Sequence, residues 1–155
     1  MYNVAFRILK DEFEAEDIMQ EAFLTAFTKL ETFKAEVTFG AWLKRIVINK
    51  SLTQLKKNNR YVEVKMDVIP NYEIVEETID YSSLKASSVV DKINSLKQNY
   101  QLILTLNLIE GFDYEEISEI MGYTNENVRT TISRAKKKLK QVLLEDTLNT
   151  TMYGR

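Results

Sequence analysis

The residues with the clearest chemical potential in this sequence lie on one helical pattern near its C-terminal end. In "NVRTTISRAKKKLKQ", Val128, Ile132 and Ala135 recur at helical spacing and are predicted to face a core. The polar side chains between them would then point outward, namely Arg129, Thr130, Ser133, Arg134 and Lys137. An arginine can donate two hydrogen bonds to guanine, and hydroxyl groups can reach bases or phosphates. The pattern predicts contact with duplex DNA, and a basic helix end that is simply solvated is the alternative.

A short helix and a glycine turn precede this pattern and would position it. In "DYEEISEIMG", Asp113 and Glu116 have the spacing of a capping box, and Gly122 would end the helix. Thr124 then offers an N-cap to the last helix. A short helix, a glycine turn and a half-apolar, half-basic helix form the helix-turn-helix pattern, whose second helix enters the major groove. Two further helices are predicted before it, at about 84–96 and 98–110.

The first half of the chain predicts a second helical unit. "YNVAFRILK" is amphipathic, and "FEAEDIMQEAFLTAFTKL" follows with one apolar face made of Ile18, Ala22, Ala26, Phe27 and Leu30. "ETFKAEV" is predicted to be a loop, after which Thr38 can cap a helix from about 39 to 57. The residues of that helix predicted to face inward are Trp42, Ile46 and Ile48.

Two surfaces of this first unit have more than one interpretation. Phe33, Lys34 and Phe39 mix aromatic rings with a cation, a combination that binds single-stranded nucleic acid, although both phenylalanines could equally belong to a core. On the preceding helix the polar residues facing away from the alanines are Asp17, Gln20 and Glu21. They form either an ordinary solvated face or a protein-docking surface.

Composition narrows the function classes. The formal net charge is −2, yet the segments Trp42–Tyr61 and Thr124–Gln141 are basic and an acidic stretch separates them. There is no cysteine or histidine, which removes disulfides, thiolate metal sites and the commonest general base. We therefore expect no metal or cofactor. No apolar run approaches the length of a membrane span, so we expect a cytoplasmic protein without direct membrane contact.

Three stretches together resemble the extracytoplasmic-function group of bacterial sigma factors. They are "AEDIMQEAFL" from Ala15, "FKAEVTFGAWLKRIVIN" from Phe33, and "IEGFDYEEISEIMGYTNENVRTTISRAKKKLK" from Ile109. The resemblance implies an all-α protein with two small helical domains. These would be a region-2 helical bundle at 1–66, a flexible acidic linker at 67–87, a region-4 helix-turn-helix domain at 88–145 and a polar tail at 146–155. Family members carry residues ahead of "YNVAFRIL", so we expect region 2 to be incomplete.

The resemblance also implies a function and its residues. The protein would be a transcription initiation factor that directs core RNA polymerase to a subset of promoters and has no catalytic activity of its own. Region 4 would bind the −35 element as duplex through the outward-facing residues of the last helix. Region 2 would melt the −10 element and capture one strand through Phe33, Lys34, Ala35, Asn49 and Thr53. The partners implied are promoter DNA, the β′ clamp helices and β flap of the polymerase, and an anti-sigma factor. The β′ clamp helices would be met by Asp17, Gln20 and Glu21.

The sequence departs from the family pattern at several of these places. Ala35 replaces the usual loop glycine, and Ala41 replaces the threonine before Trp42. Two rival functions remain open. One is a stand-alone helix-turn-helix regulator that acts without polymerase. The other is a nuclease whose metal would be held by Asp113, Glu115 and Glu116, but adjacent glutamates share a helix face poorly.

Overall fold

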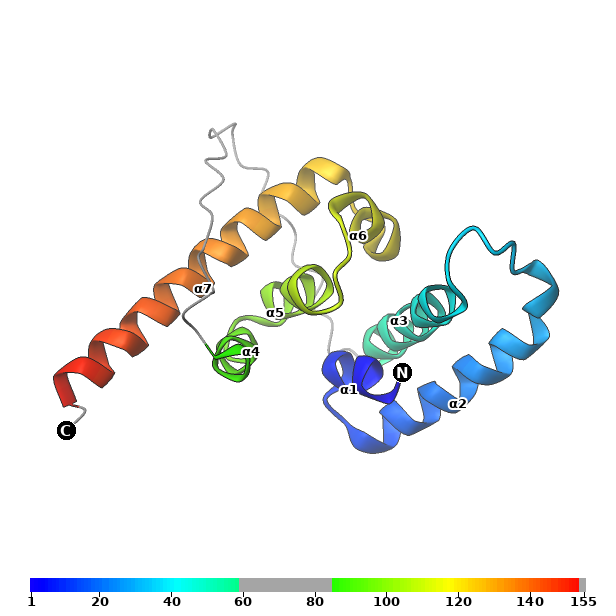
Figure 1. Ribbon diagram of the computed structural model, residues 1–155, viewed down its shortest axis with the longest axis horizontal. Coiled ribbons are helices and arrows are strands. Elements are labelled where there is room, and N and C mark those ends of the chain that lie inside the picture. The colour runs from blue at the N-terminus through cyan, green and yellow to red at the C-terminus, as the bar shows by residue number, and fades with distance from the viewer. Residues whose placement is uncertain (59–84, 154–155) are drawn as a thin grey trace. The chain divides into compact units, whose positions relative to one another are not determined.

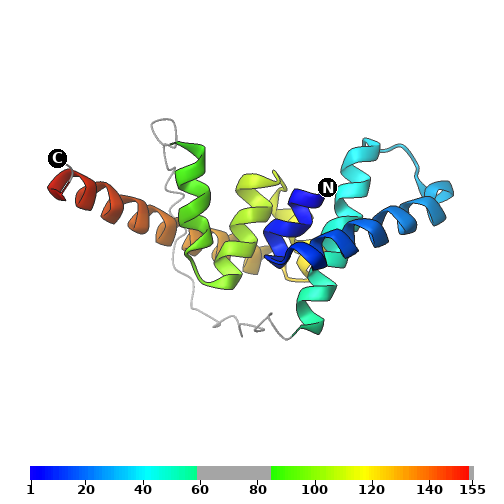
Figure 2. The same ribbon diagram turned by 90° about the horizontal axis from the view of Figure 1, so that it is seen from below.

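The computed structural model describes residues 1–58 and 85–153, and within these ranges all regular structure is helical. The chain divides into two compact units, Met1–Glu63 and Val64–Arg155. Figure 1 and Figure 2 show the helices of each unit from two directions. The predicted all-α fold with two helical domains is therefore confirmed. The predicted linker at 67–87 lies outside the described residues except at its end, where Ala86 already begins a helix.

Unit 1 is a bundle of three helices, α1 (Tyr2–Leu9), α2 (Glu12–Thr28) and α3 (Phe39–Lys57). Each of these helices packs against the other two. Its most buried apolar side chains are Ala5, Leu9, Ala15, Ala22, Val47 and Ile48. The buried residues of α2 are mostly alanines, whose small side chains permit close packing of the neighbouring helices.

Caps set the limits of the helices in unit 1. Asp11 accepts a hydrogen bond from the backbone N–H of Glu14 at 3.0 Å and starts α2. Thr38 accepts from the backbone N–H of Ala41 at 3.2 Å, and α3 begins at the next residue as predicted. Lys10 ends α1 in the left-handed region with φ 59, and partial burial together with the nearby Arg7 lowers its pKa.

Several apolar residues of unit 1 do not face the core as predicted. Phe27 is 76% exposed, and Leu30 is 49% exposed and lies beyond α2 in a 3₁₀ turn, η1 (Leu30–Thr32). The prediction for these two was wrong because the face formed by Ala15, Ile18, Ala22 and Ala26 is the one that packs. On α3, Trp42 and Ile46 are only half-buried, and Leu43 and Val47 lie in the core.

Unit 2 consists of α4 (Ala86–Asn94), α5 (Gln98–Leu104), α6 (Tyr114–Met121) and α7 (Asn125–Tyr153). The last turn of α5 widens into a π-helical stretch, η2 (Thr105–Ile109), before the chain turns at Gly111 with φ 79. Its core is made mainly of branched aliphatic side chains: Ile93, Ile103, Leu106, Ile117, Val128, Ile132 and Leu139. These side chains come from α4, α5, η2, α6 and α7, so α7 is held along much of its length.

The turn between α6 and α7 has the predicted chemistry. Asp113 and Glu116 form the capping box, with bonds of 2.8 and 2.9 Å, and Gly122 ends α6 at φ 70. Thr124 accepts from the backbone N–H of Asn127 at 3.2 Å, at the start of α7. The segment predicted to be a polar tail from 146 is helical as far as Tyr153, because α7 continues through it.

The start of this continuation of α7 contacts the rest of unit 2. Leu143 is buried, and Lys92 Nζ on α4 lies 3.0 Å from Asp146 Oδ1 on α7. Both contacts lie at the start of the segment, and residues 144–149 are otherwise exposed. Val142 is half-buried, and Leu143 lies in the core beside it.

Candidate nucleic-acid interface and docking face

The basic side of α7 begins directly after the turn that joins it to α6. Val128, Ile132 and Ala135 are almost fully buried, as predicted. Of the polar residues between them, Arg129 and Lys137 are exposed. The half-buried ones are Thr130, Ser133 and Arg134. The first turns of α7 therefore present hydroxyl and guanidinium groups together, and the contact of these groups with DNA stays a prediction.

The guanidinium of Arg129 packs on an aromatic ring. Its Cζ lies 5.6 Å from the centroid of the Tyr114 ring, at the first turn of α6. Cation–π contacts of this kind restrict the arginine without neutralising it. The capping box of α6 fixes the backbone next to Tyr114, so the arginine is placed by the helix-turn-helix geometry. Further along α7 the lysines from Lys136 to Lys140 are exposed or half-buried and are suited to phosphate contacts.

In unit 1, three aromatic rings cluster where the 33–38 loop meets α3. The centroid of Phe33 lies 5.8 Å from that of Phe39 and 5.3 Å from that of Trp42, and the latter two lie 5.7 Å apart. Phe33 and Trp42 are half-buried, and Phe39 is 45% exposed. The cluster therefore lies at the surface of unit 1, and neither Phe33 nor Phe39 is fully buried in a core.

The loop beside this cluster has an unusual backbone. Ala35 adopts φ 56, a left-handed conformation that costs a residue with a Cβ roughly 1–2 kcal/mol. This is the position at which the sequence departs from the loop glycine of the sigma-factor pattern. Lys34 and Ala35 are both exposed, so the loop projects its backbone into solvent.

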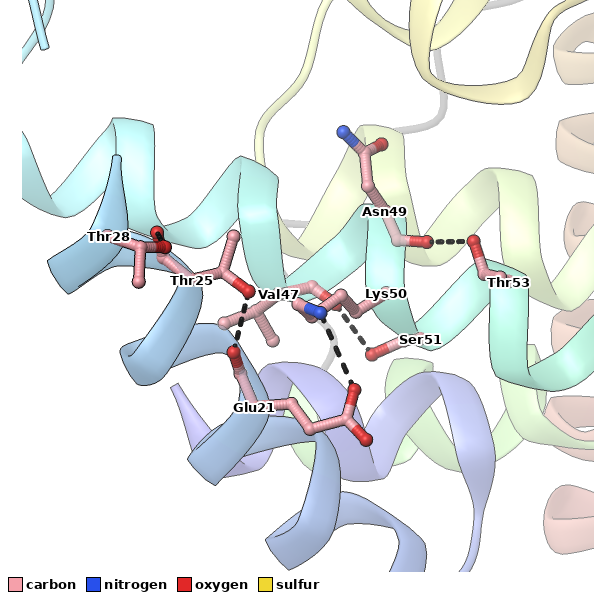
Figure 3. Close-up of polar contacts among 8 residues, drawn as sticks. All are labelled: Glu21, Thr25, Thr28, Val47, Asn49, Lys50, Ser51 and Thr53. Carbon is pink, nitrogen blue, oxygen red and sulfur yellow. Dashed lines mark hydrogen bonds and ion pairs between the residues drawn. The ribbon is translucent and has the colours of Figure 1, made fainter. Parts of the chain in front are cut away.

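A polar stripe continues along α3 from the aromatic cluster. Asn49 and Thr53 are exposed and follow Trp42 at spacings of seven and eleven residues, which places all three on one helix face. Figure 3 shows the Thr53 hydroxyl donating to the Asn49 carbonyl at 2.9 Å, while the Asn49 amide is directed away from Glu21. At 1.5 Å of rise per residue, Asn49 lies about 10 Å along the axis from Trp42. Asn49 and Thr53 therefore lie along α3 from the aromatic cluster, and their contact with a DNA strand stays a prediction.

The outward face of α2 contains more than the predicted polar residues. Asp17, Gln20 and Glu21 are exposed, as predicted. The same face includes large apolar side chains that sequence reasoning missed: Phe13 (80% exposed), Leu24 (67%) and Phe27 (76%). Residues 13, 17, 20, 24 and 27 follow helical spacing opposite the buried alanines, which is the signal that could have revealed them. Contiguous exposed apolar side chains bounded by polar ones are typical of protein-interaction surfaces.

Two other features, a membrane-spanning helix and a metal site, can be checked in the part of the chain that the structure describes. None of its helices combines the length and apolar character that crossing a membrane requires. It also holds no group of three or more acidic side chains arranged to bind a metal ion. The rival nuclease site at Asp113, Glu115 and Glu116 is therefore not formed, because Asp113 and Glu116 are engaged in the capping box.

Comparison with known proteins identifies both units. The model of sigma-70 region 2 matches residues 1–61, and that of sigma-70 region 4 matches residues 87–139. The ECF RNA polymerase sigma factor SigW of Bacillus subtilis is 28% identical, over 92% of this chain and 82% of its own length. The ECF RNA polymerase sigma-E factor of Escherichia coli is 31% identical, over 78% of this chain and 69% of its own length. For SigE of Mycolicibacterium smegmatis the identity is 28%, and the match spans 97% of this chain but 60% of that protein.

Solved structures agree with the sequence matches. The sigma factor RpoE of Bartonella quintana, solved with the anti-sigma factor NepR, superposes with a TM-score of 0.61 at 25% identity and covers 92% of this chain and 88% of that one. CnrH, solved with the cytosolic domain of CnrY, shares the fold with a TM-score of 0.56 at 23% identity. The match covers 94% of this chain and 80% of that one. The matches to regions 2 and 4, in their proper order, place this chain in the extracytoplasmic-function group of RNA polymerase sigma factors.

Proposed function

We propose that unit 2 binds the −35 element of a promoter through the first turns of α7. The carrying observation is that α7 buries its apolar stripe and leaves its hydroxyl and guanidinium groups outside the core. In this proposal Arg129 and Arg134 contact base edges, and the hydroxyls of Thr130 and Ser133 contact bases or backbone. Lys137 and the lysines after it contribute salt-dependent affinity through phosphates.

We propose that unit 1 captures the −10 element as a single strand. The aromatic cluster offers ring faces on which an unstacked base can rest, and Lys34 supplies a cation beside it. Ala35 shapes the loop that would receive the flipped base. Asn49 and Thr53 would follow the strand along α3, since they continue the face that begins at Trp42. Extruding a base from the duplex costs a few kcal/mol. Binding of the extruded base to the preformed cluster can offset this cost only after the duplex has opened.

The outward face of α2 is proposed to dock on the β′ clamp helices of core RNA polymerase. Asp17, Gln20 and Glu21 would supply the polar contacts, and Leu24 and Phe27 the apolar area. This mixture fits a protein partner better than nucleic acid, because the carboxylates would repel phosphates. Unit 2 would meet the β flap, as the family resemblance implies.

Further properties follow from this role. The protein would have no catalytic step of its own, because the polymerase supplies the chemistry. Its location would be the cytoplasm, where that enzyme works. RpoE and CnrH were each solved with a bound partner, so we propose that an anti-sigma factor also holds this protein inactive.

The direct test is transcription by purified core polymerase on fragmented genomic DNA of the source bacterium, with and without this protein. We expect start sites that depend on the protein and share two upstream elements. A pull-down with core polymerase separates this from a stand-alone regulator. Lack of association with the polymerase, or start sites without a common upstream sequence, would refute the proposed function.

A further inference from the structure

An ion pair connects the proposed docking face to the neighbouring helix. Lys50 Nζ on α3 lies 3.4 Å from Glu21 Oε2 on α2. The Lys50 side chain is 29% exposed and that of Glu21 is 61% exposed, so the cation lies at the edge of the packed helices and the carboxylate extends outward. Figure 3 shows that only one carboxylate oxygen is joined to Lys50.

Both residues of this ion pair belong to helices whose neighbouring residues are packed or hydrogen-bonded. Val47, Ser51 and Leu52 around Lys50 are buried, and the Ser51 hydroxyl donates to the Val47 carbonyl at 2.8 Å. On α2 the Thr25 hydroxyl donates to the Glu21 carbonyl at 2.8 Å. The packing of α2 against α3 therefore sets the separation of the two side chains, and Lys50 limits the directions that the carboxylate can take.

We propose that Lys50 is a positioning residue for polymerase docking. It holds one oxygen of Glu21 and leaves the other without a contact to Lys50, on the helix that also carries Asp17 and Gln20. A free glutamate loses rotamer entropy when a partner fixes it, and a carboxylate that is already oriented loses less. The inference rests on the proposed docking role of α2 and adds to it a residue that lies on the other helix.

The test measures affinity for core polymerase in the absence of DNA, so that any phosphate contact of Lys50 has no effect. Lys50→Met keeps the aliphatic stem and removes the charge, while Lys50→Arg keeps the charge. Lys57→Met is the matched control, because Lys57 is an exposed lysine on the same helix. We expect Lys50→Met to weaken binding about two- to fivefold and the other two variants to bind like the parent. High salt should reduce the loss.

A double-mutant cycle distinguishes positioning from a general structural effect. In a Glu21→Gln background, Lys50→Met should cause no further loss of affinity, and thermal unfolding should stay close to that of the parent. Equal losses in both backgrounds would overturn the proposal. Unchanged or tighter binding by Lys50→Met would also overturn it, and tighter binding would mean that Lys50 competes with the polymerase for Glu21.

The proposed docking role has its own separate test. Asp17→Asn combined with Gln20→Ala should weaken binding to core polymerase. If that double variant binds normally, the docking face is wrong and the inference fails with it. If it weakens binding while Lys50→Met does not, only the positioning role of Lys50 is refuted.

Discussion

Replacing Ala35 by glycine should stabilise unit 1, although glycine usually destabilises. Ala35 is held at φ 56, which costs a residue with a Cβ roughly 1–2 kcal/mol. Glycine relieves that strain but adds about 0.5–1 kcal/mol of unfolded-state entropy. The side chain is exposed, so little packing is lost. The free energy of unfolding should therefore rise by about 0.5–1 kcal/mol.

The matched control is the same substitution a few residues later. Ala41 is exposed in the first turn of α3, and Ala41→Gly should lower the free energy of unfolding by up to about 1 kcal/mol. Thermal unfolding followed by circular dichroism can resolve both changes, because 1 kcal/mol shifts the Tm of a domain of about 60 residues by roughly 4–8 °C. One chemical change is thus expected to act with opposite signs at two sites of one unit.

A fall in stability for Ala35→Gly, similar to that for Ala41→Gly, would refute the reasoning. It would mean that residue 35 occupies an ordinary extended or helical conformation in solution. Ala35→Val gives an independent check, because a β-branched side chain tolerates positive φ poorly. This substitution should lower the free energy of unfolding, since the added backbone strain exceeds any gain from packing.

Other predictions concern the two proposed promoter contacts, the docking face and the capping box. Arg134→Ala should weaken binding to a duplex −35 oligonucleotide by about 1–3 kcal/mol, and Lys138→Ala by less, as measured by fluorescence anisotropy. Phe33→Ala should leave that binding intact and impair open-complex formation by permanganate footprinting; equal failure of Arg134→Ala and Phe33→Ala on duplex DNA would contradict the division of roles. Phe27→Ser should change the free energy of unfolding by less than about 0.5 kcal/mol yet weaken polymerase binding in a pull-down. Asp113→Ala should cost unit 2 about 1 kcal/mol in thermal unfolding and Asp113→Asn much less.

The helix limits were the easiest features to predict, because caps are local chemistry. Thr38 and Asp113 indicate helix starts through a side-chain oxygen, and Gly122 indicates a helix end because it lacks a Cβ. The structure has a helix boundary at each of the three. The end of α7 could not be predicted in this way. Within the last part of α7, Asp146 pairs with Lys92, which is far from it in sequence, and cap chemistry gives no signal of such a tertiary contact.

On α2, Ile18, Ala22 and Ala26 are buried as predicted, and the prediction was wrong only for Phe27 and Leu30. Hydrophobic pattern alone does not say which of two apolar faces packs, and here the small alanines are buried while Phe27 is exposed. The outward direction of the predicted polar residues on α2 and α7 could be derived, because it follows from helical geometry alone. The positive φ of Ala35 could not, since glycine is the residue that normally signals that conformation.

The aromatic cluster of unit 1 has a spectroscopic consequence. Trp42 is the single tryptophan of the chain, and it lies beside Phe33 and Phe39 with part of its ring accessible. Indole emission therefore reports from this cluster alone and receives no contribution from unit 2. A nucleobase stacked nearby would change that emission without any attached dye. Stopped-flow mixing with single-stranded oligonucleotides could then time strand capture separately from every event on α7.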